Sequence, residues 1–246
     1  EMCIRDRLSL DHEFDMIREN FGKKIGRDYA ASRGEYLNGI IMANYLGFCF
    51  IDAAEVIRFH EDGSLDDEKT NELLSLRLEG EEFAVIPGFY GAKEDGTIVT
   101  FSRGGSDITG SLVARAAMAD LYENWTDVSG FLMADPRIVR NPKRIRTITY
   151  SELRELSYIG AQVLHEGTVF PVREKNIPLN IRNTNDPDHP GTLIMESFDD
   201  VDDGRLITGI AGKKNYSIIT IAKSGMSSSV GTFRQVFEVF ERHGVS

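Results

Sequence analysis

The feature that most constrains the fold is a glycine-rich turn between a predicted strand and a predicted helix. Residues 97–101 have the apolar character of a strand, residues 101–107 read FSRGGSD, and a helical apolar pattern follows from residue 108. A turn from strand into helix presents free backbone N–H groups at the positive end of the helix, where anions bind. Arg103 adds a planar guanidinium that holds a carboxylate through two parallel hydrogen bonds. The segment alone therefore predicts a site for an anionic ligand.

Strand and helix patterns alternate along the chain up to about residue 200. Apolar residues at helical spacing follow the run SRGE at residues 32–35, and Gly47 is placed to end that helix. Further helices are expected over residues 66–78, 106–120 and 150–164, the last opened by a capping box, TYSE, at 149–152. Strands are expected over residues 48–51, 83–87, 97–101, 178–181 and 192–194, with residues 90–96 as a turn-rich loop. This order predicts an α/β fold in three αβα layers, with a mostly parallel sheet covered on both faces.

Charge and cysteine content restrict the class of partner and the compartment. The formal net charge of −11 argues against nucleic acid or an anionic membrane surface as the main partner. The apolar runs are far shorter than a membrane span, and the sequence shows no secretory signal. Cys3 and Cys49 form no metal-binding pattern, and Cys49 lies in an apolar stretch. We therefore expect a buried thiol in a reducing, cytoplasmic setting.

The character of the chain changes after the acidic run DDVDDG at residues 199–204, which we interpret as a linker. Strand-like residues 206–210 and 216–222 follow, and then a polar turn at residues 225–229. Apolar residues from 230 to 240 predict an amphipathic helix. This ββα order suggests the opening of a small α+β module that is incomplete as written. Because the chain begins at Glu1 and stops directly after the helix, we expect an internal fragment of a longer protein, with residues 1–7 as a tag-like or artefactual heptapeptide.

Several short motifs, taken together, resemble aspartate kinase (aspartokinase), of the amino-acid kinase superfamily. They are SRGE at 32–35, PGFYG at 87–91, RGGSD at 103–107, WTDVSG at 125–130 running on to DPR at 135–137, GAQVLH at 160–165 and NTN at 183–185. Each is weak alone, but their order and spacing are specific, and the likeness runs from about residue 27 to the C-terminus. It implies an amino-acid kinase domain over residues 8–198 and a partial ACT regulatory domain over residues 205–246.

The resemblance implies phosphoryl transfer from ATP, with Mg²⁺, to the side-chain carboxylate of L-aspartate. The products would be 4-phospho-L-aspartate and ADP, in the first step of the pathway to lysine, threonine and methionine. A carboxylate and a triphosphate repel each other, so catalysis rests on positioning and on neutralising cations. The Mg²⁺ would be held mainly by the nucleotide's own oxygens. The family also begins with a Lys-Phe-Gly-Gly type of segment whose lysine reaches the transferred phosphate. This chain contains none, so we expect it to be weak or inactive as given.

Residue roles follow from the same resemblance. The implied substrate-binding residues are Glu35, Arg103, Gly104, Gly105 and Ser106, and the implied catalytic residues are Asp107 and Arg103. Arg103 would hold the α-carboxylate and Glu35 the α-ammonium group, while Asp107 would orient the catalytic lysine and the substrate. Each has a simpler alternative: a surface salt bridge for Arg103, a favourable helix-terminal charge for Glu35 and a helix cap for Asp107.

The implied nucleotide-binding residues are Thr126, Asp127, Leu132, Arg137, Gln162 and Val163. Two of them depart from the family, which often has an aromatic residue in place of Leu132 and a lysine in place of Gln162. Arg137 would face the ATP phosphates, although Asp135, Pro136 and Arg137 also fit a simple proline turn.

The implied effector-binding residues are Met226, Ser229 and Gly231, for which a serine-rich helix cap is the alternative. The effector would be an amino acid such as lysine or threonine, and ACT domains usually pair, so we expect a homodimer or larger assembly.

Two other functions remain open from the sequence. Another amino-acid kinase, such as a glutamate or acetylglutamate kinase, would share the fold, although the RGGSD motif and the ACT-like tail argue against it. A non-catalytic regulatory chain that binds an amino acid and assembles with complete subunits belongs to a different class. ADP release with aspartate rather than glutamate distinguishes an aspartate kinase from another amino-acid kinase. Binding of an effector without binding of nucleotide indicates the regulatory chain.

Overall fold

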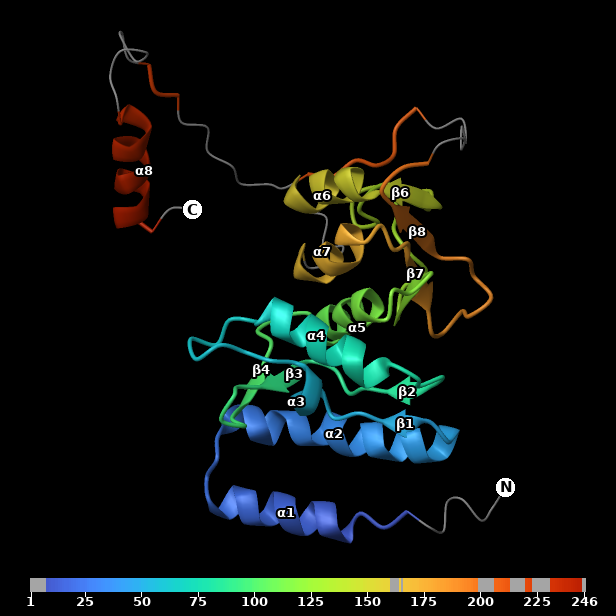
Figure 1. The fold of residues 1–246 in the computed structure, drawn as a ribbon. Coiled ribbons are helices and arrows are strands. Elements are labelled where there is room, and N and C mark those ends of the chain that lie inside the picture. The colour runs from blue at the N-terminus through green and yellow to red at the C-terminus, as the bar shows by residue number, and fades with distance from the viewer. Residues whose placement is uncertain are drawn as a thin grey trace. The chain divides into compact units, whose positions relative to one another are not determined.

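The computed structural model describes residues 8–159, 164, 166–198, 206–212, 220–222 and 231–244. The helices are α1 (Asp11–Gly22), α2 (Arg27–Leu46), α3 (Ala53–Val56), α4 (Asp67–Leu78), α5 (Gly105–Ala116), α6 (Tyr150–Ile159), α7 (Glu166–Glu174) and α8 (Thr232–Arg242) (Figure 1). The strands are β1 (Cys49–Phe50), β2 (Ala84–Val85), β3 (Tyr90–Ala92), β4 (Ile98–Thr100), β5 (Tyr122–Thr126), β6 (Thr147–Thr149), β7 (Leu179–Asn183) and β8 (Thr192–Met195). Contacts divide the chain into two units, Glu1–Gly212 and Lys213–Ser246.

The described strands of the first unit form three small sheets. Strand β1 pairs with β2 in parallel, β3 pairs with β4 antiparallel, and a four-stranded sheet has the order β5-β7-β8-β6. Within the larger sheet β5/β7 and β6/β8 are parallel, while β7/β8 is antiparallel. Helices α5, α6 and α7 lie along one face of this sheet (Figure 1). The predicted α/β class with mostly parallel pairing is confirmed, with one antiparallel pair inside the larger sheet.

Helix α5 contributes to both hydrophobic cores of the first unit. One core joins α6 and α7 to the four-stranded sheet and includes Ala114 of α5. The other joins α3, α4 and β3, and includes Ile108, Leu112 and Ala116 of the same helix. Burial of apolar side chains on two sides fixes the axis of α5. The glycine-rich turn at its start is therefore held by packing on both sides.

Local signals placed several helix ends correctly. Gly47 has a left-handed backbone (φ 74°) directly after α2, as expected of a terminating glycine. The predicted capping box is also present: the Thr149 N–H donates to Glu152 Oε2 at 2.9 Å, and the Glu152 N–H donates to Thr149 Oγ1 at 3.2 Å. These interactions begin α6 directly after β6.

The prediction of a loop over residues 90–96 is wrong, because Tyr90–Ala92 forms strand β3 of a hairpin with β4. The Lys93 N–H donates to the Thr97 carbonyl at 2.9 Å across a tight turn that contains Gly96 (φ 84°). The buried Tyr90 hydroxyl donates to Asp52 Oδ1 at 2.7 Å. The Asp-Gly pair at residues 95 and 96 is a hairpin signal that the sequence interpretation passed over.

Three further boundaries differ from the predictions. Helix α2 begins at Arg27, before the SRGE run rather than after it. The helix expected over residues 150–164 is α6, described as far as Ile159; residues 160–163 lie outside the described residues, Leu164 is not helical, and another helix, α7, begins at Glu166. Residues 206–210 are not a strand; the Ile210 N–H donates to the Met133 carbonyl at 2.6 Å, and contacts assign this segment to the first unit. The proposed linker at 199–204 lies outside the described residues.

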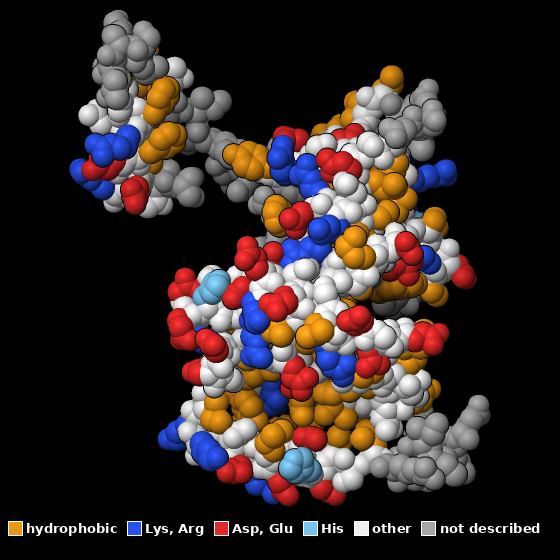
Figure 2. Space-filling view, in the orientation of Figure 1, with side chains coloured by type: hydrophobic (Ala, Val, Ile, Leu, Met, Phe, Trp, Pro, Cys, Tyr) orange, Lys and Arg blue, Asp and Glu red, His pale blue; other side chains and the backbone are white. Residues whose placement is uncertain are grey.

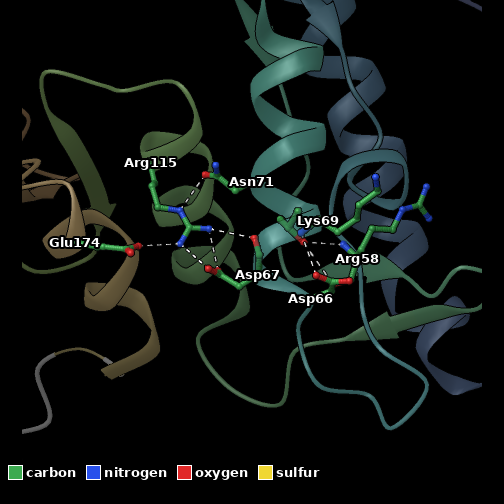
Figure 3. A network of polar contacts seen from close by, with 8 residues as sticks. Arg58, Asp66, Asp67, Lys69, Asn71, Arg115 and Glu174 are labelled. Atoms are coloured by element: carbon green, nitrogen blue, oxygen red, sulfur yellow. Dashed lines mark hydrogen bonds and ion pairs between the residues drawn. The ribbon is translucent and has the colours of Figure 1, made fainter.

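A buried arginine connects three helices of the first unit (Figure 3). The Arg115 side chain is 3% exposed, and its Nη1 and Nη2 donate to the two carboxylate oxygens of Asp67 at 2.8 and 2.9 Å. Its Nε donates to Asn71 Oδ1 at 3.1 Å, and Nη1 also lies 3.3 Å from Glu174 Oε2. Asp67 and Asn71 belong to α4 and Glu174 to α7. The C-terminal turn of α5 is thus tied to helices on both sides.

Replacement of Arg115 with methionine is expected to lower the free energy of unfolding by about 2 kcal/mol. This is less than the ~3–5 kcal/mol for breaking a fully buried pair, because the Asp67 and Glu174 side chains are 48% and 52% exposed and regain water. Urea denaturation followed by circular dichroism measures the change. In the matched control, Arg154→Met, an exposed arginine is removed and little change is expected. Equal effects of the two substitutions would contradict a stabilising network.

The second unit contains helix α8, which confirms the predicted amphipathic helix. Figure 2 shows hydrophobic side chains gathered along one side of this helix. Phe233 and Phe237 are 66% and 64% exposed, and Phe237 packs edge-on against Phe240. Residues 220–222, the other described part of this unit, are not in a strand. In the described part of the chain, no helix combines the length and the apolar character needed to cross a membrane.

Candidate functional site

The glycine-rich turn forms the N-terminus of α5, as the sequence predicted. Gly104 precedes the helix with a left-handed backbone (φ 57°, ψ 27°), and Gly105 is the first helical residue. The side chain of Arg103 is exposed and has no hydrogen-bond or ion-pair partner among the described residues. A salt bridge within this part of the chain, the simpler alternative for Arg103, is therefore absent. The first turn of α5 and a free guanidinium together offer several donors to an anion.

The segment at Gly88 and Phe89 packs directly on this turn. A Cβ atom at Gly105 would lie 2.7 Å from Phe89 Cβ, and one at Gly88 would lie 2.9 Å from Ser106 Cα. Neither position tolerates a side chain without a backbone shift. Two of the motifs that carry the family resemblance, PGFYG and RGGSD, are therefore in van der Waals contact.

Asp107 is held from strand β5. Asn124 is 7% exposed, and its Nδ2 donates to Asp107 Oδ1 at 3.0 Å. The Tyr122 hydroxyl donates to the Asp107 carbonyl at 3.1 Å, and burial, with the nearby Asp107 charge, raises the pKa of Tyr122. The Asp107 side chain makes no N-cap hydrogen bond in α5, so the helix-cap alternative does not describe it.

Glu35 reaches the same region from helix α2. It lines a cavity of about 890 Å³ together with Gly88, Ser106 and Thr109. Two residues earlier, Arg33 is 6% exposed, and its guanidinium lies 4.6 Å from the ring centroids of both Tyr29 and Tyr36. Both tyrosines belong to α2, so the contact that fixes the rotation of the helix is the one to Tyr90 of β3, whose ring centroid lies 5.4 Å from the same guanidinium. Glu35 consequently faces the cavity while Arg33 faces the protein interior.

The nucleotide-binding candidates that the structure describes lie at the end of strand β5 and in the segment that follows it. Thr126 ends β5, its carbonyl accepts from the Thr184 N–H at 2.8 Å, and the exposed Asp127 follows. Leu132 is half-buried and forms a β-bridge with Arg144.

Arg137 is paired with Asp135 through two short contacts, Nη2–Oδ2 at 2.7 Å and Nε–Oδ1 at 3.0 Å. The hydrogen bonds from Arg137 hold the pKa of Asp135 below its usual value. Arg137 therefore forms the local turn that the sequence left as an alternative.

The structure brings together the predicted substrate residues, but it tests only part of the other sets. Glu35 and Ser106 line one cavity, and Arg103, Gly104, Gly105 and Asp107 lie in the adjoining turn and first helical turn. Gln162, Val163, Met226 and Ser229 lie outside the described residues. Gly231 precedes α8 with a left-handed backbone (φ 86°).

Sequence reasoning missed Asn124 and Thr109, both of which contact site residues. Asn124 lies in β5, which is not among the strands expected from the sequence, and Thr109 looked like one more residue of an amphipathic helix. A buried polar residue inside an apolar pattern is the only signal that could have marked either one.

The fold and this site define a class of protein. The family model of the amino acid kinase family matches residues 4–183, and the chain belongs to that family. Among curated proteins, it is similar to aspartokinase 3 of Bacillus subtilis, at 36% identity over 228 residues, which are 89% of this chain and 50% of the relative. The chain thus spans about half the length of the curated relatives it matches.

Solved structures show the same similarity. Aspartate kinase of Clostridium acetobutylicum superposes with a TM-score of 0.83 at 52% identity, covering 97% of this chain and 54% of that protein. Aspartokinase III of E. coli in complex with aspartate and ADP superposes with a TM-score of 0.74 at 27% identity, covering 98% and 58%. The E. coli protein in complex with lysine and aspartate gives a TM-score of 0.65 at 26% identity, covering 96% and 57%. The resemblance to aspartate kinases that the motifs indicated is therefore confirmed.

Proposed function

We propose that this chain carries the catalytic domain of an aspartate kinase, which transfers a phosphoryl group from ATP to the side-chain carboxylate of L-aspartate. The observation that carries the proposal is the exposed Arg103, which has no partner among the described residues and lies beside the glycine turn at the start of α5. A small dicarboxylate needs cations and backbone donors in a chain of net charge −11, and this turn supplies both. The relatives named above and the aspartate bound in the E. coli structures support this substrate.

Each site residue has a role in this proposal. The Arg103 guanidinium binds the α-carboxylate of aspartate, and Glu35 binds the α-ammonium group. The N–H groups at the start of α5, where Gly104, Gly105 and Ser106 lie, face the substrate or the γ-phosphate. Asp107 is the acidic residue of the catalytic site, and Asn124 fixes one of its oxygens at 3.0 Å. Bringing a carboxylate to a phosphate against charge repulsion requires this positioning.

The nucleotide binds at the end of β5 in our proposal. Thr126 and Asp127 contact the adenosine portion, Leu132 gives apolar contact, and Gln162 and Val163 complete the set. Arg137 forms an ion pair with Asp135 in this structure. To bind the ATP phosphates, its guanidinium must break that ion pair.

Mg²⁺ arrives with ATP as part of the substrate. In the described ranges no three His, Cys, Asp or Glu side chains form a cluster that could hold a metal ion, and phosphate oxygens are ligands that Mg²⁺ prefers.

We further propose that residues 205–246 form the beginning of an ACT regulatory domain; contacts group residues 206–212 with the first unit and the rest of this region forms the second. Met226, Ser229 and Gly231 would form part of an effector loop for lysine or threonine, and pairing of such domains would give a dimer. The lysine-bound E. coli protein supports an amino-acid effector. The described part of this region supports the proposal through α8, an amphipathic helix preceded by a left-handed glycine.

ADP release in the presence of aspartate, glutamate or N-acetylglutamate tests the function, with the protein as its gene encodes it and MgATP in excess. We expect release with aspartate alone. Release with glutamate or N-acetylglutamate instead would assign another amino-acid kinase. Calorimetry that shows binding of lysine or threonine but none of MgATP would assign the regulatory alternative.

A further inference from the structure

We propose that Thr109 is a positioning residue: its hydroxyl ties Phe89 to the first turn of α5 and so holds one wall of the aspartate site in place. The proposal rests on the proposed function, because it names a residue that serves the same substrate site. It concerns a side chain that points away from the exposed turn, into the contact between two segments that are 20 residues apart in sequence.

Phe89 has a backbone conformation that a bulky residue rarely adopts. Its φ is 64°, in the left-handed region, which costs roughly 1–2 kcal/mol for a residue with a Cβ atom. Such a conformation persists only where the surroundings hold it. Two hydrogen bonds do so here: the Phe89 N–H donates to Thr109 Oγ1 at 3.1 Å, and the Phe89 carbonyl accepts from the Phe101 N–H at 2.9 Å.

The Thr109 hydroxyl acts in both directions. Besides accepting from Phe89, it donates to the Gly105 carbonyl at 2.9 Å, and the residue is 3% exposed. A hydroxyl can donate once and accept as well, so a single oxygen joins the two segments. Valine has the same shape but offers neither interaction. A valine at this position would leave the part-buried Phe89 N–H without this hydrogen-bond partner.

The wall that this contact holds belongs to the proposed substrate site. Gly88 is packed so closely on Ser106 that an added Cβ would lie 2.9 Å from Ser106 Cα. Gly88, Ser106 and Thr109 line the same cavity as Glu35. If the φ of Phe89 changes to a negative value, Gly88 must move relative to Ser106. The glycine-rich turn that carries the proposed aspartate-binding groups then loses its packing against Gly88. The nucleotide candidates on β5 have no part in this contact.

The test compares Thr109→Val with Thr109→Ser in the full protein as its gene encodes it. We expect T109V to raise KM for aspartate about tenfold, in line with the cost of a small misplacement of binding groups, and to leave KM for ATP within about twofold. T109S keeps the hydroxyl and should restore KM for aspartate to near the wild-type value. Amide hydrogen exchange should be faster at Phe89 in T109V only.

The outcomes separate this proposal from the function itself. Wild-type protein that does not phosphorylate aspartate overturns the function and the role of Thr109 with it. Active wild type with equal KM values for T109V and T109S overturns the role of Thr109 alone. Should T109V fail to fold, T109A takes its place. If T109A also fails while T109S folds, the hydroxyl is required for folding and the positioning role is overturned.

Discussion

Replacing Arg103 with methionine is expected to lower kcat/KM for aspartate about a thousandfold, which corresponds to ~4 kcal/mol at ~1.4 kcal/mol per factor of ten. The reason is the loss of a charge-assisted, two-point contact with the substrate carboxylate. Stability should be unchanged, because the side chain is exposed and has no partner within the described part of the chain. Steady-state ADP release against aspartate concentration, with saturating MgATP, measures the change.

Two further variants show whether the effect comes from the charge and shape of the Arg103 side chain. Arg103→Lys keeps the charge but loses the planar fork, and an intermediate loss is expected. Arg18→Met removes an exposed arginine on α1 and should leave the kinetics unaltered. Unchanged KM and kcat in R103M would contradict the assignment of this turn as the aspartate site. The central argument for the proposed function would then also fail.

Replacing Gly105 with alanine is expected to lower the free energy of unfolding by about 3 kcal/mol, at the upper end of the cost of overpacking. The new Cβ would lie 2.7 Å from Phe89 Cβ, 2.8 Å from Phe89 Cα and 2.9 Å from Phe101 Cβ. None of these atoms can rotate away, since each belongs to a backbone or sits next to one. Because the strained turn also carries the substrate donors, kcat/KM for aspartate should fall at least about a hundredfold. Urea denaturation and ADP release measure the two effects.

Gly34 provides the matched control for this prediction. It lies inside α2, and an added Cβ would have nothing within 4 Å. Alanine there should stabilise the protein by up to about 1 kcal/mol, since glycine is the poorer helix former. The two substitutions thus have opposite expected signs for one chemical change. A stabilising G105A would mean that the Phe89 segment does not pack on the turn.

Signals confined to a few residues predicted much of the fold. The capping box at Thr149 and Glu152, the terminating Gly47 and the strand–turn–helix at residues 97–116 each depend on neighbours in sequence, and each is confirmed. The hairpin at residues 90–100 also has a local signal, the Asp-Gly pair. No local signal predicts the hydrogen bond from the buried Tyr90 hydroxyl to Asp52. Residues 38 positions apart in the chain share that hydrogen bond, and no periodicity encodes it.

The candidate site divides in the same way. The resemblance of the motifs to aspartate kinases proposed Arg103, Asp107 and Glu35 as site residues. The contacts that orient them come from elsewhere: Asn124 to Asp107 and Thr109 to Phe89. A hydroxyl or amide inside a strand or helix pattern has many possible partners, and only the packed structure selects one. Positioning residues are therefore the part of a site that sequence reasoning leaves out.

Trp125 is the one tryptophan in the sequence, and its place in the fold makes it useful. Trp125 is 43% exposed, the Arg182 guanidinium lies 4.8 Å from its ring centroid, and Thr126 of the proposed nucleotide set is the next residue. Its fluorescence emission therefore originates beside the site where ATP is proposed to bind. Titrating this chain with nucleotide gives an intrinsic optical readout of occupancy, with no label and no coupling enzyme.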